Sequence, residues 1–200
     1  MDGTLLQEHV SCTGTQARDI ALTIDDGPDP AYTPQVLALL HRLGITATFC
    51  VVGMRASKHP DLVRAAAHAG HAIANHTQTH TFLERQTAAR VHGEVSRASE
   101  VIFAATGHPP RLFRAPGGLW SKTVFAECKA QGLRPLGWSV DPRDWSRPGT
   151  LSIVRTLLTQ TLPGSIILDH DGGGDRSQTV QALTIALPRL LDAGYRFVHA

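Results

Sequence analysis

The stretch LTIDDGPDP, residues 22–30, changes abruptly from apolar residues to two adjacent carboxylates, which a Gly-Pro turn follows. It continues the run IALTI at residues 20–24, which is short and almost wholly apolar. Such a run is typical of a parallel β-strand that is buried on both faces. Neighbouring carboxylates repel each other, and the end of a buried strand is a poor place for two of them. Asp25 and Asp26 therefore raise the question of which positive group they face.

Strand-like apolar runs recur along the chain, and segments with helical periodicity lie between them. The other six runs occupy residues 47–52, 71–75, 111–115, 135–140, 165–170 and 195–199. Seven strands with intervening helices predict either a parallel α/β barrel or a doubly wound sheet. A chain of 200 residues without a low-complexity linker predicts a single domain with a sizeable core. We expect a short lead-in at residues 1–19 and one domain over residues 20–200.

Capping signals locate helices within the intervening segments. Thr33, which Pro34 follows, predicts an N-cap and the first helical position of a helix. The longest helical pattern covers residues 84–105, and another surrounds residues 153–158. Pro188 falls inside the last helical pattern and predicts a kink or a break there. Glycines that follow helical patterns, where a left-handed residue can end a helix, are Gly44, Gly70, Gly132 and Gly194.

The composition is ordinary for a soluble globular protein, with 42% hydrophobic and 18% charged residues. A net charge of +2 without basic runs argues against a nucleic-acid partner. No apolar stretch reaches the roughly 18 residues of a transmembrane segment. The first ten residues carry no apolar signal-peptide core, which leaves open either a removed signal or a cytoplasmic protein. Cys50 is expected in the core, and a bridge between Cys12 and Cys128 is left open.

Unusual polar residues gather at the carboxyl ends of five predicted strands. In chain order they are Asp25 and Asp26, His76 and His80, Arg114, Asp141 and Asp144, and His170. The carboxyl ends of the strands of a parallel barrel meet on one face, where active sites are built. The pattern therefore predicts that these side chains converge on one functional site.

His76 and His80 are four residues apart and, from one helical face, can hold one metal ion. A carboxylate from another strand end completes three ligands and leaves positions open for water, the pattern of a catalytic metal. These ligand types leave both zinc hydrolysis and non-haem iron oxygenation open. The second aspartate is then placed to act as a base toward the attacking water, and Arg114 can hold that base ionised.

His170 can serve as a general acid, and Asp144 can hydrogen-bond it and tune its pKa. Trp145 beside Asp144 can form an apolar wall for a small substrate group. The loop DGGGDR, residues 171–176, lacks the ending of a phosphate-binding loop and is predicted to be a flexible loop next to the site.

Together these residues resemble five motifs of the polysaccharide deacetylases, the NodB-homology domain of carbohydrate esterase family 4. The resemblance covers the chain from about residue 20 to residue 198. TIDDGP is similar to motif one, usually TFDDGP, and HTQTH matches motif two, H-S/T-x-x-H. RAPGG is similar to motif three, usually R-x-P-Y-G, with Gly117 in place of the tyrosine. DPRDW matches motif four, D-x-x-D-W, and LDH matches motif five, L-x-H.

The resemblance implies a distorted parallel (β/α)7-type barrel and a divalent metal, most often zinc, with cobalt or nickel as alternatives. It implies that Trp145 and Leu168 line the pocket for the acetyl methyl group. It implies also that the backbone N–H of Gly117 binds the oxyanion, while the aromatic wall of the usual tyrosine is lost. The remaining implied roles are the metal ligands Asp26, His76 and His80, the catalytic base Asp25 with Arg114 to orient it, and the catalytic acid His170 with its partner Asp144.

The implied activity is metal-dependent hydrolysis that removes N-acetyl groups from N-acetylglucosamine units of chitin oligomers or peptidoglycan and releases acetate. The alternatives are an O-acetyl esterase acting on acetylxylan, a deacetylase of a small glycoside, and a non-catalytic carbohydrate-binding module on the same fold. The expected partner is a carbohydrate, and a monomer is favoured. The family favours a secreted or extracytoplasmic location, and a cytoplasmic one stays open.

Overall fold

Parallel strands form the centre of the structure, a computed structural model that describes residues 18–200. Within these residues seven strands are present, in the spatial order β5-β4-β3-β2-β1-β6, and β7 pairs with the first residues of β1. The strands are β1 (Asp19–Asp25), β2 (Thr48–Val51), β3 (Ala72–Asn75), β4 (Leu112–Phe113), β5 (Arg134–Pro135), β6 (Ile166–His170) and β7 (Arg196–Phe197). Each of the seven predicted apolar runs therefore contains a strand or part of one.

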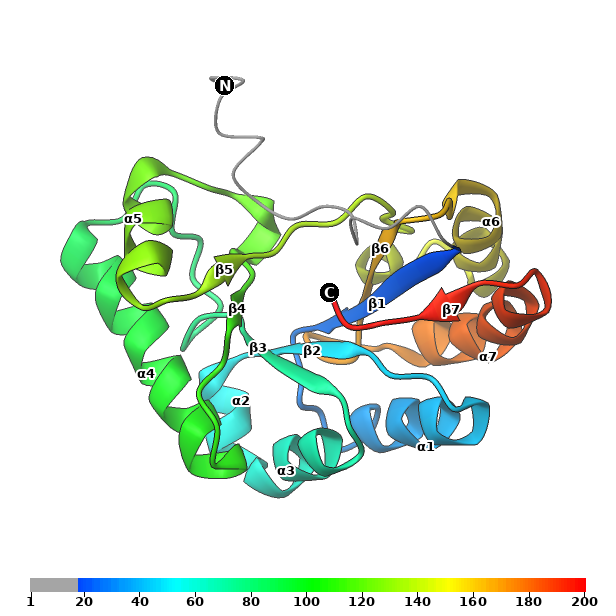
Figure 1. Cartoon of the computed structure of the whole chain (residues 1–200), viewed down its shortest axis with the longest axis horizontal. Helices are drawn as coiled ribbons and strands as arrows, with labels where there is room; N and C mark the ends of the chain where they lie inside the picture. Colours follow the sequence, from blue (N-terminus) through cyan, green and yellow to red (C-terminus); the bar gives the residue numbers. More distant parts are fainter. Residues whose placement is uncertain (1–17) are drawn as a thin grey trace.

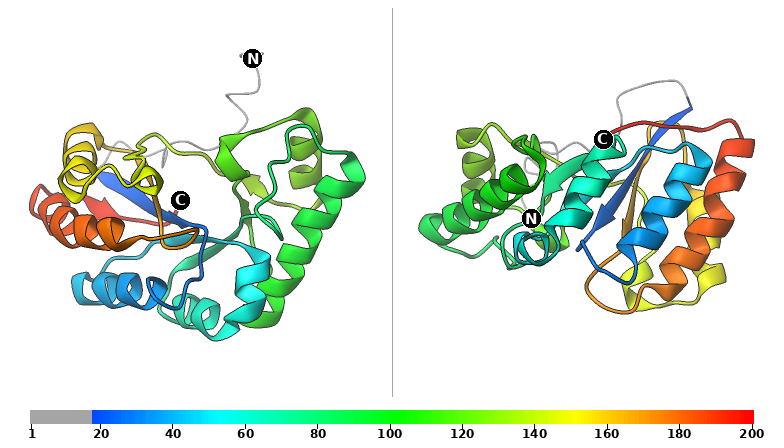
Figure 2. Two further views of the ribbon diagram at one scale, coloured as in Figure 1. Left: turned by 180° about the vertical axis from the view of Figure 1, so that it is seen from behind. Right: turned by 90° about the horizontal axis from the view of Figure 1, so that it is seen from below.

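The sheet curls into a half-barrel, and the helices surround its outer face (Figure 1). The helices are α1 (Thr33–Leu43), α2 (Gly53–Lys58), α3 (Pro60–His68), α4 (Ala88–Thr106), α5 (Lys122–Ala130), α6 (Thr150–Gln160) and α7 (Ser177–Asp192). The view from below in Figure 2 shows α1 and α7 side by side against the sheet. This arrangement confirms the expected distorted barrel in a single domain and excludes a flat doubly wound sheet.

The alternation of side chains along β1 separates two apolar regions. Ile20, Leu22 and Ile24 belong to the main core that the sheet forms with the surrounding helices. Ala21 belongs to a smaller cluster inside the curled sheet, together with residues of β3, β4 and β6. The same alternation places Asp25 on the inner face, two residues beyond Thr23. The pleat of the strand therefore directs the last carboxylate of β1 into the barrel.

The fifth strand is much shorter than the predicted run at residues 135–140. Only Arg134–Pro135 pairs with β4, and the chain then crosses toward the other edge of the sheet. Val140 forms an isolated parallel bridge with Ile167 of β6, and Ser139 donates its backbone N–H to the carbonyl of Ile166. The run predicted as one strand therefore pairs with β4 at its start and with β6 at its end, because this segment crosses from one edge of the sheet to the other.

Helix boundaries depart from the sequence prediction at three places. Tyr32 rather than Thr33 is the N-cap of α1, because the Thr33 hydroxyl donates to a buried Asp171 carboxylate 2.5 Å away. The longest helix, α4, begins at Ala88 after the N-cap Thr87, whose hydroxyl accepts from the N–H of Arg90. The predicted break at Pro188 is wrong, since α7 continues through it to Asp192.

The four glycines predicted to end helices all have left-handed backbones, with φ between 65° and 86°. Cys50 and Cys128 are buried free thiols, whereas Cys12 and most of the predicted lead-in lie outside the described residues. None of the described helices combines the length and the apolar character that crossing a membrane requires.

Candidate active site

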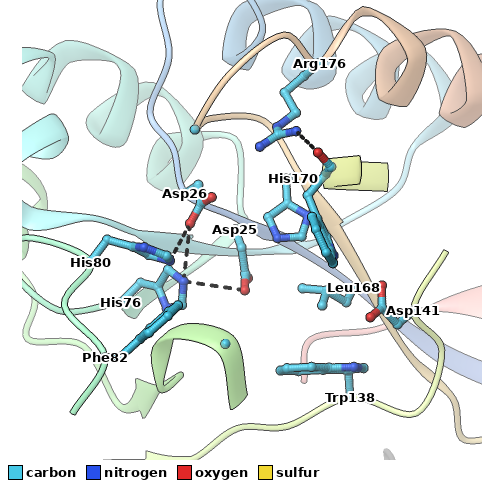
Figure 3. A pocket seen from close by; sticks show the side chains of 13 residues that line it. Asp25, Asp26, His76, His80, Phe82, Trp138, Asp141, Leu168, His170 and Arg176 are labelled. Atoms are coloured by element: carbon cyan, nitrogen blue, oxygen red, sulfur yellow. Dashed lines mark hydrogen bonds and ion pairs between the residues drawn. The ribbon is translucent and has the colours of Figure 1, made fainter. Parts of the chain in front are cut away.

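A pocket opens at the carboxyl ends of the strands, as the sequence predicted, and has a volume of about 440 Å³. It receives side chains from the ends of β1, β3 and β6 and from the loops after them (Figure 3). Arg114 lies buried beneath its floor, and Asp144 lies buried behind His170. The lining residues are Asp25, Asp26, His76, His80, Phe82, Gly117, Trp138, Asp141, Trp145, Leu168, His170, Gly173 and Arg176.

Asp26, His76 and His80 form a compact group on one side of this pocket. The Nε2 atoms of His76 and His80 lie 3.4 and 3.0 Å from Oδ1 of Asp26. That oxygen is buried, and no described residue forms a hydrogen bond of regular geometry with it. The potential ligand atoms of Asp26, His76 and His80 all lie within 4.8 Å of one another. Two imidazoles and a carboxylate that face one point fit a divalent metal ion.

Hydrogen bonding fixes which nitrogen of His76 faces this point. Nδ1 of His76 lies 2.8 Å from the carbonyl oxygen of Arg114, and a carbonyl can only accept. Nδ1 therefore carries a proton, and in the neutral form of the ring the lone pair is on Nε2, the nitrogen that faces Asp26. A backbone carbonyl that orients an imidazole in this way is common behind metal-binding histidines.

The electrostatics of the triad favour a bound cation. Burial by itself raises the pKa of Asp26, but His76 and His80 outweigh this effect and lower the pKa below its usual range. Burial likewise acts to lower the pKa of His76, yet the charges of Asp25 and Asp26 raise it. The ionised form of Asp26 is thus favoured, and the two adjacent aspartates face the imidazoles of His76 and His80, which answers the question that they raised.

The loop between the two histidines is not the predicted helix. Thr77 and His80 have left-handed backbones, with φ of 66° and 61°, so the i, i+4 spacing brings the imidazoles together through a turn. Their ring centroids lie 4.9 Å apart. Asp26 is also left-handed, with φ of 72°, at the point where β1 ends. The prediction of convergence is confirmed, and the prediction of a shared helical face is wrong.

Side chains of β3 and α4 hold this loop in place. Asn75 accepts the N–H of Thr77 at 2.8 Å and donates to the carbonyl of Val95 at 2.8 Å. Glu94 of α4 is buried and accepts both the N–H and the hydroxyl of Thr79, at 2.8 and 2.9 Å. The sequence signal for Glu94 was its position on the apolar face of a helix, where an acid needs partners.

Arg114 anchors Asp25 from below the pocket. Its guanidinium is completely buried and donates to Oδ1 of Asp25 at 2.8 Å and to the Thr23 hydroxyl at 2.5 Å. It also donates to the carbonyl of Gly137 at 2.7 Å. These bonds engage one carboxylate oxygen of Asp25 and leave Oδ2 facing the pocket, 3.7 Å from Nε2 of His76. The predicted pairing of Arg114 with Asp25 is present in the structure.

His170 and Asp144 form a second buried pair across the pocket. Nδ1 of His170 lies 2.7 Å from Oδ1 of Asp144, whose Oδ2 accepts from the His170 N–H and the Thr179 hydroxyl. Burial acts to lower the pKa of His170, but the hydrogen bond and the charge of Asp144 outweigh it and raise the pKa. With Nδ1 engaged, Nε2 is the nitrogen left to serve the pocket.

The predicted pocket residues Trp145 and Leu168 line the pocket, and so does Gly117, whose backbone N–H was predicted to bind the oxyanion. Phe82 and Trp138 line it as well, and neither was predicted from the sequence, because each is an ordinary apolar residue in its segment. Figure 3 shows Phe82 on the side of His76 and His80, and Trp138 near Leu168 and Asp141. The polar centre of the pocket is therefore framed by aromatic rings.

The glycine-rich loop at residues 171–176 lies next to the site, as predicted, and packs tightly on Asp26. A Cβ at Gly172 would collide with the carbonyl oxygen of Asp26, and one at Gly173 would lie 2.6 Å from Oδ2 of Asp26. Arg176 is buried, donates to the carbonyl of Gly172 at 2.6 Å and lines the pocket. The loop therefore forms part of the wall, which its glycine content alone did not reveal.

Two buried aspartates on either side of His170 were not predicted. Burial, together with nearby carboxylate charges, raises the pKa of Asp171 to about 7, although its bond with the Thr33 hydroxyl opposes this. Asp169 is buried, and within residues 18–200 neither of its carboxylate oxygens has a hydrogen-bond partner. Burial and the charge of Asp144 raise its pKa well above the usual value. The signal was present in the sequence, since Asp169 interrupts an apolar strand.

Comparison with known proteins finds a matching family profile and relatives of similar sequence. The sequence profile described as polysaccharide deacetylase matches residues 13–136. A peptidoglycan-N-acetylglucosamine deacetylase of Bacillus cereus is 44% identical over 181 residues, which cover 90% of this chain and 84% of that protein. A chitooligosaccharide deacetylase of Bradyrhizobium sp. is 44% identical over 190 residues, which cover 89% of this chain and 87% of that protein.

Solved structures of known proteins show the same fold. The crystal structure of a peptidoglycan N-acetylglucosamine deacetylase in complex with 4-naphthalen-1-yl-N-oxidanyl-benzamide superposes with a TM-score of 0.94 at 30% identity, and covers 100% of this chain and 94% of that one. A family 4 carbohydrate esterase from Streptomyces lividans in complex with acetate superposes with a TM-score of 0.84 at 33% identity, and covers 94% of this chain and 93% of that one.

Proposed function

The chain belongs to the polysaccharide deacetylase family, carbohydrate esterase family 4, and from this we propose that it removes N-acetyl groups from N-acetylglucosamine units and releases acetate. Peptidoglycan and chitooligosaccharides, the substrates in the names of its relatives, both contain this unit. The observation that carries the proposal is one pocket that holds the triad Asp26, His76 and His80 with a separate base and acid. A pocket for carbohydrate binding alone needs none of these groups.

The triad would hold a divalent metal, as the family generally requires, and we propose zinc, with cobalt and nickel as alternatives. Two imidazole nitrogens and one carboxylate oxygen are a common ligand set for catalytic zinc, which keeps further positions open. The chemistry that such an ion supplies is Lewis acidity toward the acetamide carbonyl and the attacking water.

Asp25 is the proposed base. Its Oδ2 faces the pocket and takes a proton from the water that attacks the acetamide carbon. Arg114 stabilises the ionised carboxylate through Oδ1, and it fixes the carboxylate plane because its guanidinium also binds Thr23 and Gly137. The two adjacent aspartates thus have different proposed tasks, Asp26 as ligand and Asp25 as base.

His170 is the proposed acid. Asp144 binds Nδ1, so Nε2 donates its proton to the amide nitrogen as the carbon–nitrogen bond breaks and the amino sugar leaves. The hydrogen bond and the charge of Asp144 raise the pKa of His170, which favours the protonated imidazole that an acid requires. We propose that the backbone N–H of Gly117 stabilises the negative oxygen of the tetrahedral intermediate. Trp145 and Leu168 would surround the acetyl methyl group, because both line the same pocket.

The test is acetate release by the zinc-loaded protein from chitooligosaccharides, peptidoglycan and acetylxylan, with an Asp25→Asn variant beside it. We expect release from the first two substrates and a loss of about 10²–10⁴-fold in the variant, because a general base commonly contributes that much. Asp61→Asn, which removes an exposed carboxylate from the first turn of α3, is the control and should leave the rate unchanged.

Other outcomes of this experiment contradict the proposal in different ways. Release from acetylxylan alone would identify an O-acetyl esterase, and release from small acetylated glycosides alone would identify a narrower substrate. Oligosaccharide binding without acetate release would identify a binding module. A requirement for iron and oxygen would identify an oxygenase. Full activity of Asp25→Asn would show that another group is the base.

A further inference from the structure

Phe82 is an exposed aromatic side chain at the mouth of the pocket. Phe82 is 52% exposed and lines the pocket. Leaving this apolar surface in contact with water is unfavourable in free energy. It follows His80 in the loop after β3, and its ring packs edge-on against the His80 imidazole with centroids 6.1 Å apart. Trp145, 47% exposed, also lines the pocket. Two large exposed rings at one polar pocket are typical of a surface that binds a ligand with apolar faces.

The position of Phe82 depends on the glycine at residue 117. A Cβ at Gly117 would lie 3.3 Å from Cε1 of Phe82, so a side chain there would press on the ring. Gly117 also has a left-handed backbone, with φ of 65°. The wall of the usual tyrosine is absent at Gly117, and the ring of Phe82 lies against the bare glycine on this side of the pocket.

Trp138 extends this wall over the next glycine. A Cβ at Gly118 would lie 2.6 Å from Cη2 of Trp138, which also lies with its ring over the Arg114 guanidinium at 5.5 Å. Consecutive glycines therefore keep the turn at residues 116–118 bare, and aromatic rings from other segments cover it. The Arg114 guanidinium lies against the ring of Trp138, whereas about half of the surface of Phe82 is left exposed by the described residues.

A sugar ring matches the exposed face of Phe82. A pyranose carries polar hydroxyls at its rim and C–H groups on its faces, so an aromatic ring can bury the face while the rim stays hydrated. Phe82 lines the same pocket as Asp25 and His80 and contacts His80, so its ring borders the space that a substrate acetamide and its sugar would enter. We propose that Phe82 is a specificity-determining residue that stacks on a sugar ring of the substrate.

This inference rests on the proposed deacetylase function and names a group that selects the sugar. The competing explanation is that Phe82 only shields His80 and the metal from solvent. The two explanations differ in what a truncation does. Loss of a sugar contact weakens binding of oligosaccharides and raises KM, whereas loss of a shield weakens metal binding or lowers kcat at saturating substrate.

The experiment compares Phe82→Ala, Phe82→Leu and Phe82→Tyr with the unsubstituted enzyme, all zinc-loaded, on chitooligosaccharides of two to five units. Phe103→Ala is the matched control, because Phe103 is 54% exposed on α4 and does not line the pocket. Binding of chitotetraose to the metal-free proteins is measured by calorimetry, and zinc affinity is measured by competition with a chelator.

We expect Phe82→Ala to raise KM and the chitotetraose Kd about tenfold, with kcat and zinc affinity within about twofold, because burial of an aromatic face and its stacking are lost. Phe82→Leu should lie close to Phe82→Ala, and Phe82→Tyr and Phe103→Ala close to the unsubstituted enzyme. This pattern would support stacking on the sugar.

Two results would overturn the inference. If Phe82→Ala binds chitotetraose as tightly as the unsubstituted protein and keeps its KM, no sugar stacks on Phe82, while the proposed function stands. If zinc affinity falls in Phe82→Ala and the KM does not change, Phe82 acts as a shield. Failure of the unsubstituted protein to bind or deacetylate any chitooligosaccharide would instead contradict the proposed function itself.

Discussion

At the scale of single residues, the carboxylate of Asp144 governs the proton on His170. The proposed acid His170 must be protonated to act, so we expect activity to fall as the pH rises through its pKa. Asp144 raises that pKa and therefore moves the alkaline limit of activity to higher pH. We predict that Asp144→Asn shifts the alkaline limb of the pH profile of kcat/KM downward by about one unit, since a lost neighbouring charge commonly changes a pKa by that much.

The Thr179→Val variant separates the effect of the charge on Asp144 from the effect of its hydrogen bonding. The Thr179 hydroxyl donates to Oδ2 of Asp144 at 2.8 Å, so valine removes a bond to the carboxylate and leaves its charge in place. We expect the alkaline limb of this variant to stay where it is in the unsubstituted enzyme. The assignment of His170 as the acid would be contradicted if Asp144→Asn changed the rate at every pH equally and left the limb unmoved.

At the scale of secondary-structure elements, α4 serves as the support of the loop that carries both histidines. The buried Glu94 binds the N–H and the hydroxyl of Thr79, and Arg90 pairs with it at 2.8 Å. Glutamine at this position keeps one acceptor and loses the charge. We predict that Glu94→Gln lowers the free energy of unfolding by about 2 kcal/mol, because buried bonds to a charged group are weakened.

The same change should weaken zinc binding about tenfold, since His80 directly follows Thr79 and a supporting residue typically changes metal affinity by about 10–100-fold. Denaturant unfolding of the metal-free protein and chelator competition measure the two effects separately. Glu100→Gln, an exposed glutamate of the same helix, is the control and should change neither. A destabilised Glu94→Gln variant with unchanged zinc affinity would restrict Glu94 to a role in stability.

Strands and the residues at their ends were predictable from the sequence, whereas loops were not. The apolar runs at β1 and β6 predicted where Asp25 and His170 lie, because the hydrophobic residues of a buried strand indicate where the strand ends. The turn from His76 to His80 was mistaken for a helix, since both conformations allow an i, i+4 approach. Phe82 was missed because its importance depends on Gly117, which lies far away in the sequence.

At the scale of the whole molecule, the half-barrel brings the proposed metal ligands together from two separate segments. Asp26 lies at the end of β1, and His76 and His80 lie after β3, with β2 between these strands in the sheet. The Arg114 pair with Asp25 and its carbonyl bond with His76 connect the same region to the end of β4. The unfolded chain does not hold these groups together, so a bound ion stabilises the folded state selectively.

We therefore predict that zinc raises the melting temperature of the chelator-treated protein. Free zinc at 100 times its Kd adds about 2.7 kcal/mol to the free energy of unfolding, which for a domain of this size corresponds to a rise of roughly 5–10 °C. Calorimetry across a zinc titration measures the rise. His80→Ala should abolish most of it, because one ligand is lost.

The control for this shift is a histidine–carboxylate pair elsewhere on the molecule. His92 lies 2.9 Å from Glu127 on the surface, where α4 packs against α5, and offers zinc a weaker site of fewer ligands. His92→Ala should keep the full rise, because the stabilising ion binds only where three ligands converge. An equal rise in His80→Ala, or its loss in His92→Ala, would show that zinc acts through the surface pair and not through the triad at the strand ends.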